Sequence, residues 1–147
     1  KDVTTVNIYT PNTGAPKYMK QILTDLKGEI DSNTIIVGDF NSPLIALDTS
    51  RQEIYQETVD LNWTLDQINP KDIYRTCYST NAEYTFFLSV HETSCKIDHN
   101  LVHQTSLNKL LKIDIISTIF SDHSGIKLEI NSKRNCQNYI NTLKLNN

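Results

Sequence analysis

The sequence lacks the long apolar run that a membrane span requires, and its N-terminal residues do not form a secretory signal peptide. It is also poor in cysteine: the three present are an odd number with no C-x-x-C spacing, at Cys77, Cys95 and Cys136. Neither a disulfide framework nor a zinc site is therefore indicated. We expect reduced thiols in an intracellular compartment and no membrane partner.

Positive charge is not in excess either. The chain has 14 Lys and Arg against 17 Asp and Glu, a formal charge of −3, which argues against binding nucleic acid over its whole surface. A local basic face stays open. The 147 residues, 38% hydrophobic and 21% charged, are typical of one soluble globular domain without repeats. Because the chain begins at Lys1 and its only methionine is Met19, we expect a piece of a longer protein that starts inside a strand.

Apolar periodicity predicts alternating strands and helices. The expected strands span residues 3–9, 34–37, 84–88, 96–102, 113–119 and 126–130. The expected helical segments span 16–30, 54–65, 72–75 and 107–112. This mixture predicts an α/β (α+β) fold with a mixed sheet. We expect residues 1–130 to form the domain and the polar residues 131–147 to leave it as a tail or the start of a linker.

Polar side chains recur at the ends of the predicted strands. Asp39 and Asn41 follow the apolar, β-branched run 34–37, with Gly38 allowing a turn. In extended chain these two side chains point to the same side. The pairs Asp98-His99 and Asp122-His123 also follow or close apolar runs. Polar groups that leave core strands together are typical of a catalytic site.

This inventory matches a metal-assisted phosphoryl hydrolase better than a thiol or serine enzyme. Such an enzyme needs a hard cation, a base that activates water, and groups that contact the phosphate oxygens. Ser121 and Ser124 flank an Asp-His pair, but the chain has no G-x-S-x-G pattern. Structural interpretations stay open: Asp39 as a turn or cap residue, and His99, which faces away from Asp98, as a structural histidine.

Five blocks occur in an order that resembles the endonuclease/exonuclease/phosphatase superfamily, which includes exonuclease III-like abasic-site nucleases and DNase I. They are Val6-Asn7-Ile8-Tyr9-Thr10-Pro11-Asn12, Gly38-Asp39-Phe40-Asn41, Tyr84-Thr85-Phe86, Lys96-Ile97-Asp98-His99 and Ser121-Asp122-His123-Ser124. The resemblance is closest to the endonuclease domain of mammalian LINE retrotransposons. It implies a DNase I-like fold, a sandwich of two β-sheets flanked by helices, here without its N-terminal strands.

The resemblance also implies four catalytic residues. Asp39 would position or deprotonate the attacking water, and Asn41 would hold the scissile phosphate beside it. Asp98 would orient His123, whose imidazole would contact the phosphate as charge develops in the transition state.

Further roles follow from the same resemblance. Tyr9 and Asn12 would contact phosphate, although the residues alone could equally be a strand end and a turn. Thr85 would lie near the substrate strand. Asp122 would serve the water shell of the metal, which is usually Mg²⁺, with Mn²⁺ as a substitute.

The function implied is nicking of chromosomal DNA at T-rich/A-rich junctions in the nucleus, with a reverse transcriptase downstream in the same polypeptide. However, the family strands that carry an asparagine and the main metal-ligand glutamate have no counterpart here. The glutamates that the chain does have at Glu29, Glu53, Glu57 and Glu83 do not occur in the matching context. We therefore expect the chain alone to be weakly active at best and marginally folded. A catalytically inactive fragment or retrotransposon remnant, and a phosphomonoesterase of the same superfamily, are the alternatives.

Overall fold

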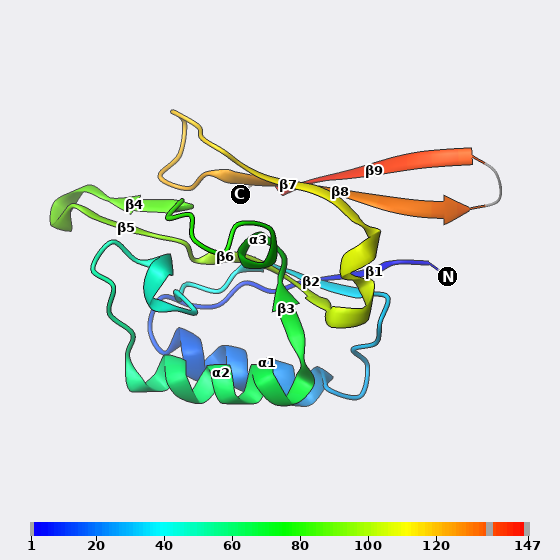
Figure 1. Ribbon diagram of the computed structural model, residues 1–147. Helices are drawn as coiled ribbons and strands as arrows, with labels where there is room; N and C mark the ends of the chain where they lie inside the picture. Colours follow the sequence, from blue (N-terminus) through cyan, green and yellow to red (C-terminus); the bar gives the residue numbers. More distant parts are fainter. Residues whose placement is uncertain (1, 135–136, 146–147) are drawn as a thin grey trace.

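The computed structural model describes residues 2–134 and 137–145, and its strands form three sheets with two long helices on one side (Figure 1). The strands are β1 Thr4–Asn7, β2 Thr34–Asp39, β3 Pro70–Asp72, β4 Phe86–Leu88, β5 Thr93–Cys95, β6 Asp98–His103, β7 Leu110–Ile116, β8 Gly125–Arg134 and β9 Gln137–Leu145. The helices are α1 Ala15–Leu26, α2 Gln56–Ile68 and α3 Ile73–Cys77, with the short 3-10 helices η1 Ala46–Asp48, η2 Ser89–His91 and η3 Gln104–Lys109.

The central sheet has the strand order β1-β2-β6-β3, with β1 parallel to β2 and the other two pairs antiparallel. A second sheet, β7-β8-β9, is antiparallel throughout, and β4 and β5 form a separate hairpin. Helices α1 and α2 cover one face of the central sheet, and β7 and β8 lie over the other (Figure 1).

Side-chain alternation along β2 explains this layering. Ile36 packs under the helices with Met19 and Leu61, whereas its neighbours Ile35 and Val37 point into a second core. The second core lies against the β7–β8 pair. A strand that is apolar at consecutive positions is buried on both faces. The predicted class, a two-sheet sandwich flanked by helices, is therefore confirmed.

Two segments differ from the sequence-based expectation. The helix predicted over 107–112 is instead η3, which ends at Lys109, because the following residues pair with β8 as β7. The polar tail predicted over 131–147 differs as well: β8 continues to Arg134 and pairs with β9. Backbone pairing in a hairpin does not depend on an apolar run, so polar composition alone did not exclude strands there. The domain division at residue 130 stays a prediction.

Two further expectations from the sequence concern a membrane span and the cysteines. Among the described residues, no helix is both long and apolar enough to cross a bilayer. Cys77 and Cys95 are free thiols, and Cys136 lies outside the described residues.

Candidate active site

The β2–β6 pair brings two carboxylates together. Asp39, the last residue of β2, is the register partner of Asp98, the first residue of β6. Side chains of directly opposed residues lie on the same face of a sheet, about 5 Å apart at Cβ. Both aspartates are buried, at 8% and 6% exposure. Two buried like charges at this spacing require a compensating partner.

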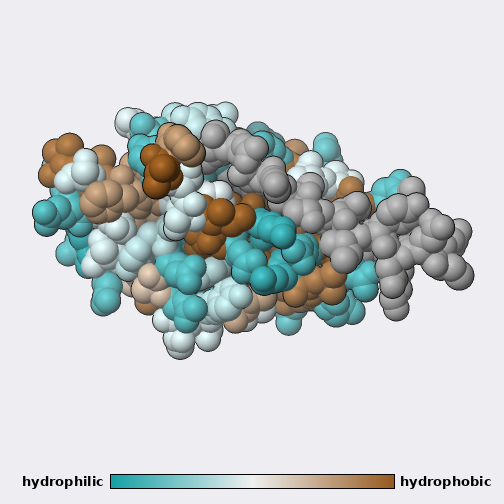
Figure 2. Space-filling view, turned by 90° about the horizontal axis from the view of Figure 1, so that it is seen from above, coloured by the Kyte–Doolittle hydropathy of each residue, from teal (hydrophilic) through white to brown (hydrophobic). Residues whose placement is uncertain are grey.

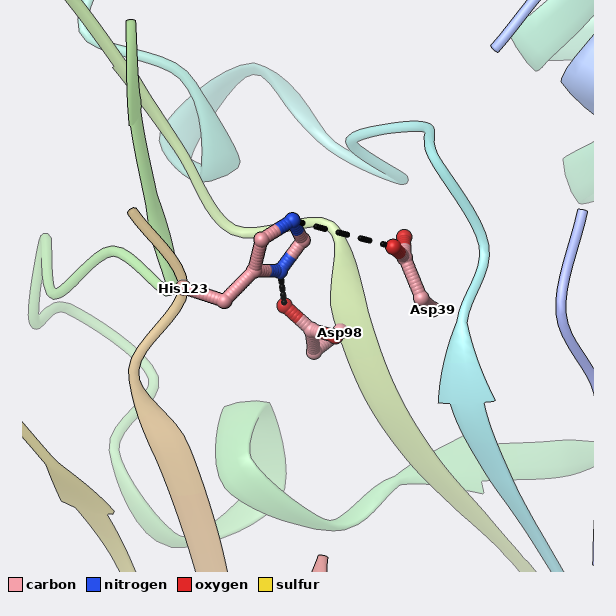
Figure 3. A group of neighbouring side chains, drawn as sticks. All are labelled: Asp39, Asp98 and His123. Atoms are coloured by element: carbon pink, nitrogen blue, oxygen red, sulfur yellow. Dashed lines mark hydrogen bonds and ion pairs between the residues drawn. The ribbon is translucent and has the colours of Figure 1, made fainter. Parts of the chain in front are cut away.

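That partner is His123, in the loop between β7 and β8 (Figure 3). Its Nδ1 is 3.1 Å from Oδ2 of Asp98, and its Nε2 is 3.8 Å from Oδ2 of Asp39. A carboxylate only accepts hydrogen bonds, so Nδ1 carries the proton that it donates to Asp98. The Phe86 ring packs on the imidazole with the ring centres 4.9 Å apart. Asp98 and Phe86 thus fix the ring, and Nε2 faces Asp39.

The environment of the Asp39 carboxylate increases its affinity for a proton. Burial raises the pKa of Asp39, and the charge of Asp98 raises it further. A hydrogen bond from the Asn41 backbone N–H and the nearby His123 act in the opposite direction, but burial outweighs them. A carboxylate with a raised pKa is a better proton acceptor than an exposed one.

Asn41 reaches the site through a turn and not through extended chain. Its φ of 45° is in the left-handed region, which asparagine tolerates better than most residues. Its backbone N–H donates to Oδ1 of Asp39 over 2.9 Å, and its side-chain amide donates to the carbonyl of Thr10. The expectation that Asp39 and Asn41 project side by side from a strand is therefore corrected, because the strand ends at Asp39.

These groups face a cavity of about 510 Å³. Its wall is formed by Tyr9, Asn12, Asp39, Asn41, Phe86, Asp122 and His123. The structure thus brings six of the eight sequence-predicted site residues to one surface, with Asp98 behind His123. Segments separated by more than a hundred residues meet here.

Thr85 is the exception, and the predicted substrate contact is not supported for it. The residue is fully buried, at 0% exposure, so no substrate reaches it. Its hydroxyl oxygen accepts hydrogen bonds from the backbone N–H groups of Ile97 and Asp98, over 3.1 and 3.2 Å. Its carbonyl accepts from the N–H of Ser124 over 2.6 Å. Thr85 therefore connects the segments that carry Asp98 and His123.

Sequence reasoning missed Phe86, whose ring contacts His123 and lines the cavity. The signal was present in the alternation of the block Tyr84-Thr85-Phe86: where Thr85 points inward, Phe86 points to the opposite side. Large apolar side chains are also exposed nearby, on the β4–β5 hairpin and in the β7–β8 loop, and brown atoms lie at that end in Figure 2. Ile119 and Phe120, in that loop, are 93% and 92% exposed.

The donor set fits a hard divalent cation in part. Among the described residues, one group of acidic and histidine side chains has ligand atoms within 4.8 Å of one another: Asp39, Asp98 and His123. Because Asp98 is already bonded to His123, Asp39 is the carboxylate of this group that a cation could use. Asp122 adds a second carboxylate on the cavity wall. One or two carboxylates, completed by water and substrate phosphate, are a typical set for Mg²⁺.

Comparison with known proteins shows which solved structures have a similar fold. No family model matches the chain. An AP endonuclease from Archaeoglobus fulgidus is similar over 83% of this chain and 59% of its own, with a TM-score of 0.70 and 12% identity. The 3′ phosphatase NExo from Neisseria, bound to a product DNA hairpin, is similar over 90% and 62%, with a TM-score of 0.72 and 18% identity.

A third similar structure is the endonuclease domain of TRAS1, a telomere-specific non-LTR retrotransposon, with a TM-score of 0.66 and 16% identity over 86% of this chain and 56% of that domain. The chain therefore shares its fold with these three structures, and the DNase I-like fold that the resemblance implied is confirmed. It spans 56–62% of the length of these three structures.

Proposed function

We propose that this chain carries the catalytic residues of a metal-dependent DNA endonuclease that nicks its target by hydrolysing a phosphodiester. The observation that carries the proposal is the imidazole of His123 between two buried carboxylates, at the wall of an open cavity. A histidine oriented by a carboxylate and a second carboxylate with a raised pKa supply the two functions that phosphoryl hydrolysis needs from side chains.

Each residue has a role in this proposal. Asp39 takes a proton from the attacking water, whose oxygen forms the new bond to phosphorus as the bond to the leaving alcohol breaks. His123 contacts a non-bridging phosphate oxygen through Nε2, while Asp98 holds Nδ1. The Asn41 amide has a second N–H beside the one given to Thr10, and this N–H is directed to the phosphate. Tyr9 and Asn12, which line the same cavity, also contact phosphate.

A divalent cation, Mg²⁺ or in its place Mn²⁺, would be held by Asp39 and by Asp122 through its water shell. It would supply neutralisation of the charge that develops on the phosphate. The glutamate expected as the main ligand has no counterpart in this chain, so we propose that complete metal binding depends on residues outside it. An inactive fragment is the corresponding alternative.

DNA is the proposed substrate. Support comes from the Neisseria structure, which is bound to a DNA hairpin, and from the TRAS1 domain, which belongs to a retrotransposon. The exposed Ile119 and Phe120 are separated from Asp122 and His123 by Ser121 alone. Some DNA-binding proteins insert exposed apolar side chains between base steps. Action at T-rich/A-rich junctions in the nucleus and a reverse transcriptase downstream belong to the same proposal.

A phosphomonoesterase is the second candidate, because the Neisseria protein is described as a 3′ phosphatase. Both reactions use the same attacking water and the same phosphate contacts. They differ in whether the phosphate joins two nucleosides or ends a strand.

A nicking assay tests the proposal. Supercoiled plasmid and a hairpin with a 3′-phosphate are incubated with the chain in Mg²⁺ or in EDTA. Metal-dependent nicking that disappears in Asp39→Asn and persists in Asp25→Asn, an exposed helix residue, supports the endonuclease. Release of phosphate from the hairpin without nicking supports the phosphatase. No reaction with either substrate, in a chain shown to be folded by circular dichroism, contradicts both activities for this chain.

A further inference from the structure

A second cluster of titratable side chains lies behind the active site, on the opposite face of β6 from Asp98. Lys96 and His99 are fully buried, at 0% exposure, and the side chain of Asp72 is 14% exposed. The ammonium nitrogen of Lys96 is 2.8 Å from Oδ2 of Asp72 and 2.9 Å from Nδ1 of His99. Burial alone would raise the pKa of Asp72, but the attraction of Lys96 and the hydrogen bonds outweigh it, so the pKa of Asp72 is well below its usual value.

The contacts of the ring determine the role of Nε2. At that end the ring lies 2.9 Å from the carbonyl oxygen of Ser42, which only accepts, so Nε2 donates to it. At the other end Nδ1 lies between two charged partners: the Lys96 ammonium at 2.9 Å, from which a bare Nδ1 accepts, and Oδ2 of Asp72 at 3.0 Å, to which a protonated Nδ1 donates. Both arrangements at Nδ1 keep the proton on Nε2.

The Ser42 carbonyl belongs to the turn that presents the catalytic groups. Asp39 ends β2, Asn41 is in the left-handed region, and Ser42 follows directly. The turn is fixed on its N-terminal side by the strand pairing and by the Phe40 N–H, which donates to Ile97 over 2.9 Å. On its C-terminal side, His99 binds the Ser42 carbonyl, and the Phe40 ring packs on the imidazole at 5.1 Å between centres.

We propose that His99 is a positioning residue for the Asp39–Asn41 turn: its Nε2–H holds the Ser42 carbonyl, and the contacts of Nδ1 with Lys96 and Asp72 hold the ring in the orientation that makes this bond. The inference rests on the proposed function. Asp98 and His99, adjacent in β6, thus act on the reaction from opposite faces of one strand. Asp98 orients His123 on the substrate side, and His99 holds the turn with Asp39 and Asn41 from behind.

Three substitutions of His99 separate positioning from stability. In His99→Gln the side-chain amide nitrogen takes the place of Nε2 and keeps the donor to Ser42. In His99→Asn the amide nitrogen takes the place of Nδ1 and leaves Ser42 without a donor. His99→Phe keeps the aromatic contact with Phe40 and removes both polar groups. Leu23→Ala in α1, a buried core residue, is the control for lost stability alone.

Single-turnover nicking is measured over a range of DNA concentrations, with rates corrected for the folded fraction. We expect His99→Asn and His99→Phe to lower the maximal rate about tenfold or more with little change in the half-saturating DNA concentration, because small displacements of catalytic groups are costly. We expect His99→Gln and Leu23→Ala to stay near the wild-type rate. If His99→Phe does not fold, the comparison of His99→Gln with His99→Asn alone tests the positioning role. Equal rates for Gln and Asn would overturn the proposal.

A measurement without catalysis separates this inference from the proposed function. The Asn41 backbone N–H donates to Asp39, so its exchange with solvent reports the turn. In amide-exchange NMR we expect the protection of Asn41 to fall in His99→Asn and to stay unchanged in His99→Gln and Leu23→Ala. If the wild-type chain does not nick DNA, the proposed function fails and the exchange data alone decide the positioning role. Unchanged protection in His99→Asn would overturn it.

Discussion

Asp39 and Asp98 face each other across the β2–β6 pair, with the imidazole of His123 between their carboxylates. Like charges in directly opposed positions of a sheet are unfavourable, and burial increases the repulsion. The hydrogen bond from His123 to Asp98 offsets part of this cost, while burial, with a smaller contribution from the charge of Asp98, raises the pKa of Asp39. The Asp39 and Asp98 carboxylates therefore repel each other at the place where a proton acceptor and a cation would act.

The first prediction concerns the repulsion between these two carboxylates. Asp39→Asn removes one of two opposed carboxylates at nearly constant volume. We expect nicking to fall at least about 100-fold, the range for loss of a general base, while the melting temperature stays equal or rises. Plasmid nicking and thermal unfolding, with Asp25→Asn as the exposed control, check the two halves. A melting temperature several degrees lower would show that the Asp39 carboxylate stabilises the fold.

The second prediction concerns Thr85, which accepts two backbone hydrogen bonds beside Asp98. Thr85→Val keeps the shape and leaves two buried N–H groups without an acceptor, at a cost of about 1–3 kcal/mol for each. Thr85→Ser keeps the oxygen. We expect Thr85→Val to lower the free energy of unfolding by about 2–4 kcal/mol. Thr85→Ser should lower it by less, and urea denaturation measures both.

The nicking kinetics of Thr85→Val and Thr85→Ser show whether Thr85 holds the backbone at Asp98 or contacts the DNA. Since Thr85 is buried, we expect Val to lower the maximal nicking rate with little effect on the half-saturating DNA concentration. An effect confined to the half-saturating concentration, equal in Ser and Val, would restore the substrate contact that the sequence predicted.

Much of this site could be predicted because its residues follow local rules. The β-branched run 34–37 specifies a buried strand, and Asp39 was expected just after it; in the structure β2 continues through Gly38 and ends at Asp39. The two-residue period of a strand also separates Asp98 from His99. The interpretation of His99 as structural follows from the same period, and its ring indeed points away from Asp98 into the second cluster.

The rest depends on contacts distant in sequence. Lysine is almost never fully buried, and the counter-charge for the buried Lys96 is Asp72, 24 residues earlier in the chain. The burial of Thr85 likewise depends on two segments that it joins. Strands β3 and β5 have three residues each, too few for a periodic pattern. Asn41 was read as extended chain, although its amide and backbone hydrogen bonds stabilise a turn.

The third prediction concerns acid stability. Because the pKa of Asp72 is lower in the folded chain than its usual value of 3.8, its contribution is complete above that value and is lost as pH falls below it. We expect Asp72→Asn to lower the free energy of unfolding at pH 7 by about 3–5 kcal/mol, since Lys96 would remain buried without a counter-charge. The difference from wild type should shrink between pH 4 and more acidic solution in urea titrations. Asp66→Asn, exposed on α2, is the control; a pH-independent difference for Asp72→Asn would contradict the ion-pair explanation.

The last prediction concerns Gly38, directly before Asp39. Its φ is +140°, and a Cβ there would overlap the carbonyl oxygen of Ile8, a backbone atom that cannot move aside without disturbing the β1–β2 pairing. Gly14 also has a positive φ, of +72°, but a Cβ there would meet nothing within 4 Å. The two glycines therefore share an unfavourable backbone conformation and differ in the space around it. We expect Gly14→Ala to cost about 1 kcal/mol in urea denaturation, for the backbone conformation alone. Gly38→Ala should cost about 3 kcal/mol or more, since overlap adds to the strain. Equal costs would mean that the close approach of Ile8 does not determine this position, and that the strand end before Asp39 has room to relax.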